Sequence, residues 1–225
     1  MAKFSKPDGT LFTQISSGIY RGKKLALPAL SSTRSTKSIV KGSFFNTWRA
    51  ELRGAVFIEC FGGSGAMALE ALSNGAKNVY AIEKDAAAHK IMRKNFELFG
   101  LGANAILGDC FEELLEILHE LQTDMNGCSA VNLSESHTVN SSENSFFDPT
   151  RRVFVYLDPP FAIRQGFGGI YERVLALIAR LGSAQCELLI AIEHMSELEL
   201  PPKIGDFALL KSRKFGATTM SYYAK

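Results

Sequence analysis

The sequence predicts an α/β protein with a doubly wound, mostly parallel sheet. From residue 54 onward, short apolar segments rich in β-branched residues alternate with longer helix-forming segments. A glycine-rich turn joins the first of these strands to the first helix, and the last two strands follow each other with no helix between them. Such alternation is typical of parallel βαβ units, and the final pair is typical of an antiparallel hairpin at a sheet edge.

Seven strands are expected in this sheet. They are residues 55–60, 79–82, 104–107, 152–157, 187–192, 207–211 and 218–223. Helices are expected at residues 65–74, 85–99, 110–121 and 168–181. Gly75 and Gly100 follow two of these helices, as expected for the left-handed conformation that often ends a helix.

Composition limits the kind of protein. With 225 residues, of which 46% are hydrophobic, the chain can bury a core and is expected to form one domain with an appendage. It has no apolar run long enough to span a membrane and no apolar signal-peptide core, so we expect a cytoplasmic protein without a membrane partner. Cys60, Cys110, Cys128 and Cys186 are scattered, which predicts reduced thiols and no metal site.

Charge divides the chain into two parts. Residues 1–53 carry ten Lys and Arg against two acids, whereas residues 54–225 carry fifteen against twenty-one. We therefore expect a basic extension, built from a small hairpin around Arg21-Gly22 and a helix ending near Trp48, that binds a polyanion. The alternative is a basic tail that only aids solubility.

One segment interrupts the alternation of strands and helices. Residues 123–150 are rich in Ser and Asn and hold few aliphatic side chains. Long segments without periodicity are unusual inside a domain, so we predict a flexible insertion in the 54–225 domain. Whether this insertion is a disordered loop or a lid stays open.

The glycine-rich turn follows the first strand. Gly63-Ser64-Gly65-Ala66-Met67-Ala68 fits the pattern G-x-G-x-x-G/A at a strand-to-helix junction, where open α/β sheets bind ligands. The pattern alone also allows a nicotinamide dinucleotide, or a glycine turn without a ligand. Glu59 favours S-adenosylmethionine, because a carboxylate repels a pyrophosphate and attracts an ammonium and a sulfonium group.

Acidic residues follow the next two strands. Glu83 ends the second strand about twenty residues after the glycine turn, the usual position of an acid that binds ribose hydroxyls. Asp109 follows the third strand and could accept a hydrogen bond from an adenine amine. It could equally cap the helix that begins at Cys110.

Asp158-Pro159-Pro160-Phe161 follows the fourth strand. The two prolines stiffen the backbone and remove two N–H donors, which leaves carbonyl groups facing outward. A carboxylate, a rigid carbonyl and an aromatic ring suit a planar base with an exocyclic amine. Asp158 and the Pro159 carbonyl would accept the amine hydrogens, while Phe161 would stack on the base. The alternative is a proline turn with a core phenylalanine.

These motifs resemble the ribosomal small-subunit methyltransferase D family, over most of residues 14–225. Residues 59–76 are similar to the family's cofactor turn and helix, residues 158–161 to its catalytic tetrad, and residues 20–25 to its N-terminal hairpin. The resemblance implies a Rossmann-like class I fold that transfers a methyl group from S-adenosylmethionine to guanine N2 in 16S rRNA. The expected partner is 16S rRNA within an assembling small subunit, and whether the substrate is naked RNA or a partly assembled subunit stays open.

The resemblance assigns residues to roles. The catalytic residues are Asp158, Pro159, Pro160 and Phe161. The cofactor-binding residues are Glu59, Phe61, Gly62, Gly63, Ser64, Gly65, Glu83, Lys84, Asp109, Cys110 and Asp158. The charge of the basic extension, rather than the resemblance, selects the residues expected to bind RNA, which are Arg21, Lys23, Lys24, Arg34, Lys37 and Lys41. We expect a monomer without a metal.

Three other functions stay open from the sequence. A DNA adenine-N6 methyltransferase would use the same tetrad, since the tetrad does not separate the two amines. A nicotinamide-dependent dehydrogenase would use the same glycine pattern. A non-catalytic RNA-binding module would need only the basic extension.

Overall fold

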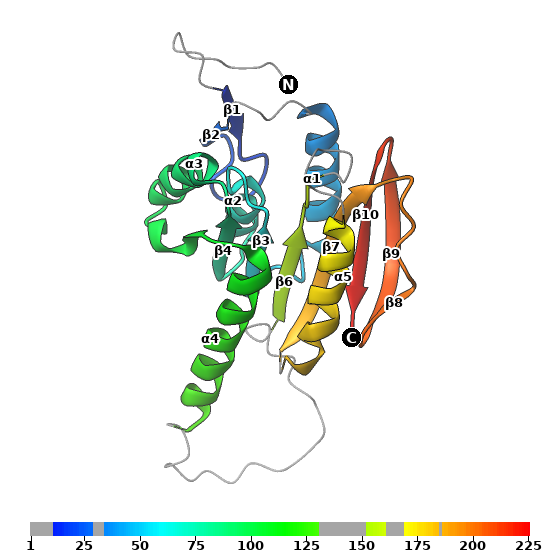
Figure 1. Cartoon of the computed structure of the whole chain (residues 1–225). Coiled ribbons are helices and arrows are strands. Elements are labelled where there is room, and N and C mark those ends of the chain that lie inside the picture. The colour runs from blue at the N-terminus through cyan, green and yellow to red at the C-terminus, as the bar shows by residue number, and fades with distance from the viewer. Residues whose placement is uncertain (1–10, 29–33, 131–151, 161–168, 185) are drawn as a thin grey trace.

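A computed structural model describes residues 11–28, 34–130, 152–160, 169–184 and 186–225 (Figure 1). The N-terminal part consists of β1 (Leu11–Gln14) and β2 (Lys24–Leu27), which pair antiparallel, followed by helix α1 (Arg34–Trp48). The sequence predicts both elements, but the first strand of the hairpin lies earlier than expected and Arg21-Gly22 is not a tight turn between the strands. Residues 15–23 connect β1 to β2, because the backbone of Ser16 and Ser17 donates to Glu70 instead of to a partner strand.

The remaining strands form one sheet in the order β5-β4-β3-β6-β7-β10-β9-β8. Their bounds are β3 (Val56–Cys60), β4 (Asn78–Glu83), β5 (Ala105–Leu107), β6 (Arg152–Leu157), β7 (Glu187–Met195), β8 (Lys203–Ile204), β9 (Phe207–Phe215) and β10 (Thr218–Ala224). The pairs from β5 to β7 are parallel, and β10 runs antiparallel to both β7 and β9. The predicted α/β class with an antiparallel edge is confirmed.

The sheet holds the seven predicted strands and one more. The two-residue strand β8 follows Pro201-Pro202 and pairs with the start of β9. Two residues are too few for a period-two pattern to be read from a sequence. Strand β9 also runs to Phe215, beyond the predicted end, because pairing with β10 continues over the basic residues of this edge strand.

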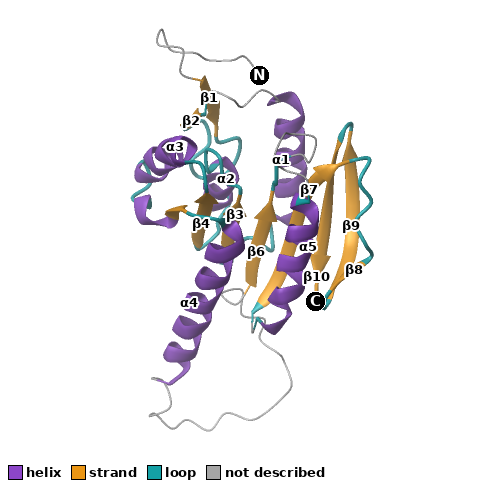
Figure 2. Cartoon of the chain, viewed as in Figure 1, coloured by secondary structure: helices purple, strands orange, loops and turns teal. Residues whose placement is uncertain are grey.

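Helices cover both faces of the sheet (Figure 2). They are α2 (Ala66–Ser73), α3 (Ala86–Glu97), α4 (Cys110–Ala130) and α5 (Ile170–Arg180), with short 3₁₀ turns at Gly102–Asn104 and Leu181–Ser183. One core cluster joins α1, α2 and α3 to one face, and a second joins α4 and α5 to the other. The central strands are therefore buried on both sides, which explains their continuous apolar runs.

Helix α4 extends further than predicted. It continues through Ala130, so residues 123–130, which we expected to belong to the flexible insertion, are helical. The Ser- and Asn-rich composition after Leu121 hid this continuation, because few apolar residues mark a helical face there. The remainder of the predicted insertion lies outside the described residues.

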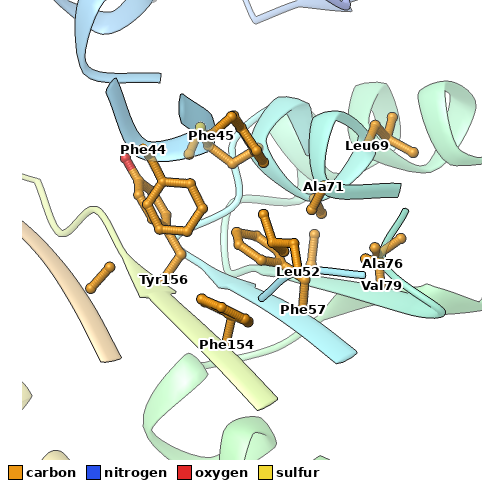
Figure 3. Close-up of a cluster of buried hydrophobic side chains, with 14 of the residues drawn as sticks. Phe44, Phe45, Leu52, Phe57, Leu69, Ala71, Ala76, Val79, Phe154 and Tyr156 are labelled. Atoms are coloured by element: carbon orange, nitrogen blue, oxygen red, sulfur yellow. The ribbon is translucent and has the colours of Figure 1, made fainter. Parts of the chain in front are cut away.

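Phe44 of α1 fills the centre of the first core cluster (Figure 3). The side chain is fully buried, and its ring lies 5.8 Å from Phe57, 6.2 Å from Phe154 and 5.7 Å from Tyr156, in each case edge to face. Edge-to-face aromatic pairs add about 0.5–1.5 kcal/mol each beyond the burial of their area. Helix α1 is thus part of the same core as the sheet.

A buried carboxylate also connects the N-terminal segment to the sheet domain. Glu70 of α2 accepts hydrogen bonds from the backbone N–H groups of Ser16 and Ser17, at 2.9 and 2.8 Å. The Nζ atom of Lys41 in α1 lies 2.7 Å from the other carboxylate oxygen. The Glu70 side chain is completely buried, so its charge is balanced within the protein rather than by water.

This arrangement lowers the pKa of Glu70. Burial alone would raise it, but the Lys41 ammonium and the hydrogen bonds from Ser16 bring the pKa below the usual value of 4.5. A carboxyl group whose pKa is lower in the folded state stabilises the fold above its unfolded pKa. This stabilisation is lost as the pH falls through the folded-state pKa.

We predict that Glu70→Gln destabilises the protein by roughly 2–4 kcal/mol at neutral pH, because it leaves the Lys41 ammonium without its buried counter-charge. The difference from the original chain should shrink as the pH falls through the lowered pKa of Glu70. Denaturant unfolding at a series of pH values measures both effects. The matched control is Glu97→Gln, whose carboxylate forms an exposed ion pair with Arg93, and it should change stability by less than about 0.5 kcal/mol. Equal effects of the two substitutions would contradict the prediction.

Candidate active site

The candidate site lies where β3 and β6 end. These two strands are parallel neighbours, and Cys60 pairs with Leu157 in register. The glycine turn and Asp158 therefore leave the sheet side by side, one strand spacing or about 4.8 Å apart in the backbone. The structure thus brings together the two motifs that the sequence places about a hundred residues apart.

The glycine turn is held by α3 and β4. The Gly62 N–H donates to the Ile82 carbonyl at 2.8 Å, and the Gly65 N–H donates to the Gly62 carbonyl at 2.8 Å. A Cβ atom on Gly65, which has φ +72°, would lie 2.4 Å from the Phe96 ring. Close packing on α3 therefore requires glycine at this position.

Gly63 has a different environment. Its φ is +55°, but a Cβ atom here would meet no heavy atom within 4 Å. The backbone of the turn thus faces open space at Gly63, where a ligand can approach it closely. This opening is what a small-molecule cofactor would need.

Glu59 is buried at the start of α2. Its Oε2 accepts a hydrogen bond from the Ala68 N–H at 2.8 Å, in a side chain that is only 5% exposed. Gly65 occupies the N-cap position and has no side chain to satisfy the first N–H groups of the helix. The carboxylate of the predicted cofactor-binding acid therefore caps α2 and places negative charge at its N-terminus.

Glu83 connects the end of β4 to the glycine turn. Its Oε2 accepts the Gly63 N–H and its Oε1 accepts the Asp85 N–H, both at 2.7 Å. Each carboxylate oxygen can accept a further hydrogen bond, so these contacts leave capacity for ribose hydroxyls. The Ser64 carbonyl is held in turn by the Asn95 side-chain amide at 2.8 Å.

Asp109 caps α4, the alternative that the sequence left open beside adenine recognition. Its Oδ1 accepts the Phe111 N–H at 3.2 Å, and its Oδ2 lies 3.0 Å from Lys84 Nζ and 3.7 Å from an Arg173 nitrogen. Burial would raise the pKa of Asp109, but the hydrogen bonds from Lys84 and Phe111 lower it below the usual range. The carboxylate therefore stays ionised at neutral pH, and nothing in this geometry prevents a further contact.

Two aromatic rings stand beside this acid. Phe61, which has φ +59°, contacts Phe111 edge to face at 6.0 Å, and the Arg173 guanidinium lies 3.9 Å above the Phe111 ring. The thiols of Cys60 and Cys110 are buried nearby, and their hydrogen bond together with burial raises the pKa of Cys60. Cys110 is therefore a core residue of α4 as well as a neighbour of the turn.

A buried tyrosine–glutamate pair lies next to Asp158, and sequence reasoning missed it. The Tyr156 hydroxyl donates to Glu193 Oε2 at 2.7 Å, and both side chains are buried. Burial raises the pKa of Tyr156 well above its usual value, and the charges of Glu193 and Asp158 raise it further. Glu193 lies near the end of β7, so the rule that found Asp158, a polar residue at the end of a strand, could also have found Glu193.

The predicted RNA-binding residues differ in their surroundings. Arg21 and Lys24 are exposed. The Lys23 ammonium donates to the Leu98 carbonyl at 3.0 Å and lies 4.1 Å above the Phe99 ring, while Lys41 is held by Glu70. Arg34 and Lys37 lie in the first turn of α1, where only the backbone is described. Phe161 of the tetrad lies outside the described residues, whereas Asp158, Pro159 and Pro160 lie within them.

Among the described residues, no group of three His, Cys, Asp or Glu side chains is arranged to hold a metal ion. No helix in the same part of the chain is both long and apolar enough to cross a membrane.

The order of the strands, the glycine turn after β3 and the acids at the same edge define a class I methyltransferase fold, the class of enzymes that use S-adenosylmethionine. Within this class, the chain belongs to the family described as Conserved hypothetical protein 95, which matches residues 13–125 and 110–224.

Named relatives extend this assignment. The chain is 27% identical over 214 residues to ribosomal RNA small subunit methyltransferase D of Escherichia coli strain K12, covering 94% of this chain and 89% of that protein. It is 24% identical over 225 residues to the Haemophilus influenzae protein of the same name, covering 99% of both. The solved structure of yhhF from Escherichia coli superposes with a TM-score of 0.63 at 25% identity, over 95% of this chain and 98% of that one.

We predict that Gly65→Ala destabilises the fold more than Gly63→Ala. Both substitutions place alanine at positive φ, which costs about 1–2 kcal/mol. Only the alanine at position 65 would also collide with Phe96, so α3 or the turn must move. Chemical denaturation of the two variants under identical conditions measures the difference. Equal losses of stability would mean that the turn does not pack on α3 as described.

Proposed function

We propose that this protein is an S-adenosylmethionine-dependent methyltransferase that methylates the exocyclic N2 amine of a guanine in 16S rRNA. The observation that carries the proposal is the register of β3 and β6. It sets a glycine turn suited to a small cofactor beside a carboxylate and a rigid proline pair suited to an amine. The names of the relatives in Escherichia coli and Haemophilus influenzae support ribosomal RNA of the small subunit as the substrate.

The residues of the glycine turn fit the proposed cofactor. Gly63 opens toward free space, and Glu59, Glu83 and Asp109 place carboxylates along the same edge of the sheet. We propose that Glu59 and the turn hold the methionine part, that Glu83 holds the ribose, and that Asp109 contacts the adenine. Phe61, Gly62, Ser64, Gly65, Lys84 and Cys110 complete the proposed binding set. S-adenosylmethionine, when bound, supplies an activated methyl group on a sulfonium.

Asp158 would orient the acceptor amine. The amine lone pair is delocalised into the base, so hydrogen bonds from both amine hydrogens to the Asp158 carboxylate and the Pro159 carbonyl would localise it and direct it at the methyl group. The prolines keep this corner rigid, because they fix φ and contribute no N–H donors. Much of the rate enhancement would come from such positioning.

Negative charge near the acceptor would have a second effect. As the new carbon–nitrogen bond forms, the amine nitrogen gains positive charge and must lose a proton. Glu59, Asp158 and Glu193 all lie close enough to raise the pKa of Tyr156, so their charges gather around one point of the edge. A carboxylate in this place would stabilise the developing cation, and we propose that Asp158 accepts the proton.

The proposed substrate is tested by its methylation state. Mass spectrometry of rRNA nucleosides from cells with and without this gene should show that one N2-methylguanosine of 16S rRNA disappears when the gene is deleted. The purified protein and S-adenosylmethionine should restore it on small-subunit particles from the deletion strain. Methylation of duplex DNA adenine instead of rRNA would contradict the proposed substrate. The absence of methyl transfer to any nucleic acid would contradict the assignment as a nucleic-acid methyltransferase.

We predict that Asp158→Asn lowers kcat for rRNA methylation by about 10²-fold or more, because the amide presents an N–H group where a second acceptor is needed. The unfolding midpoint should change little, and kcat is measured at saturating S-adenosylmethionine because Asp158 also belongs to the predicted cofactor-binding residues. The matched control is Asp206→Asn, which removes an exposed carboxylate that faces Lys225 far from the glycine turn, and it should leave kcat unchanged. An active Asp158→Asn enzyme would show that the carboxylate does not direct the amine.

A further inference from the structure

We propose that a surface formed by α1 and β9 binds the RNA backbone next to the methylated base. We call it the α1–β9 surface and define it as Ser43, Thr47, Arg49, Lys211 and Arg213. The inference rests on the proposed function and names a contact surface outside the basic hairpin. The surface lies across the sheet from Asp158, at the same level of the strands.

The strand register connects this surface to the active site. Leu157 pairs with Ile192, so Asp158 continues beside Glu193. Glu193 pairs with Met220, which pairs in turn with Arg213. Residues paired across a sheet share a face, so this row runs from the catalytic carboxylate to the arginine over three strand spacings, about 14 Å. Nucleotides that flank a base placed at Asp158 can reach that far.

Helix α1 and strand β9, which flank this row, are basic. They hold three Lys or Arg residues each, of which Lys41 is paired with Glu70, and α1, β9 and β10 contain no Asp or Glu. The acids of the row itself are Asp158 and Glu193 at its other end. Most of the acidic residues of the chain lie elsewhere, since residues 54–225 have a formal charge of −6, from fifteen basic and twenty-one acidic residues. A local basic surface on a body of opposite charge is the electrostatic signature of a polyanion site.

Neutral hydroxyl groups hold the side chain of Arg213 in position, so its positive charge is not balanced by these partners. Its guanidinium donates to the Ser43 hydroxyl at 3.2 Å and to the Thr47 hydroxyl at 3.4 Å, both from α1. These partners are neutral, so they orient the group and leave its charge intact. The remaining N–H donors of the exposed side chain can bind phosphate oxygens in the planar geometry that arginine favours.

Lys211 and Arg49 flank Arg213. The Lys211 ammonium lies 4.4 Å above the Trp48 ring and 5.3 Å from the Tyr222 ring, which holds a cation beside the helix. Arg49 is exposed just after α1, with one weak contact to Asn46 at 3.5 Å. Within the described part of the chain, neither these two residues nor Arg213 forms an ion pair with a carboxylate.

The contrast with the N-terminal segment strengthens the inference. Lys41 was predicted to bind RNA, but its ammonium balances the buried Glu70. Its charge is therefore used inside the protein, whereas the cations of the α1–β9 surface face neutral or aromatic partners and remain available to phosphate. Lys23 resembles the cations of this surface, because its partners are the Leu98 carbonyl and the Phe99 ring.

The test compares RNA binding by two double variants of the full-length protein. Arg49→Gln with Arg213→Gln should raise the Kd for unmethylated 16S rRNA particles from the deletion strain by about tenfold. The slope of log Kd against log salt should fall by about one for each phosphate contact that is lost. The Kd for S-adenosylmethionine and the unfolding midpoint should stay within error of the original protein.

The matched control is Arg180→Gln with Lys203→Gln, which removes two exposed cations outside the α1–β9 surface, one at the end of α5 on the other face of the sheet and one on β8 beside the start of β9. It makes the same change in net charge and should leave the RNA Kd and the salt slope unchanged. Equal RNA affinity of the two double variants would contradict the proposal that the α1–β9 surface binds RNA, and it would leave the proposed function intact. Failure of the original protein to methylate these particles would overturn the proposed function, and the binding measurement would still decide whether the surface contacts RNA.

Discussion

The parallel pairing of β3 with β6 is the constraint on which the rest of the site depends. Neither strand carries the chemistry alone: one ends in a glycine turn and the other in an acid followed by two prolines. Their register leaves both ends at the same level of the sheet. Because both strands are buried on both faces, a slip in that register would move each side chain into the wrong core cluster and disrupt its close packing, so the fold itself maintains the geometry of the site.

The carboxylates of the candidate site also serve the fold. Glu59 caps α2, Glu83 joins the glycine turn to the next helix, and Asp109 caps α4. A group held by backbone N–H donors keeps one orientation, which reduces the reorganisation needed when a ligand binds. Structural and binding roles of these residues are therefore compatible, and each acid can use its remaining lone pairs toward a cofactor.

The N-terminal segment is joined closely to the sheet. Its helix supplies Phe44 to the main core cluster, and Lys41 supplies the counter-charge of the buried Glu70. The separation at residue 53 is therefore a change in charge along the chain rather than a break in packing. This attachment also sets α1 against β9, where the hydroxyl groups of Ser43 and Thr47 accept hydrogen bonds from Arg213.

The sequence by itself determined the α/β class, the seven main strands and the motifs at their ends. It could do so because alternating apolar periods and glycine or proline turns are local signals that each segment carries alone. Residues such as Glu59, Glu83 and Asp158 could be selected for the same reason, since each directly follows or ends an apolar run.

Only the tertiary structure decided how these residues are used. The cap formed by Glu59, the pairing of Tyr156 with Glu193 and the burial of Lys41 against Glu70 join residues that are far apart in the chain or on different elements. A charge on a lysine is visible in a sequence, but whether water, a carboxylate or a nucleic acid balances it depends on which elements pack around it. The same holds for Arg213, which becomes part of a site only because β9 lies against α1.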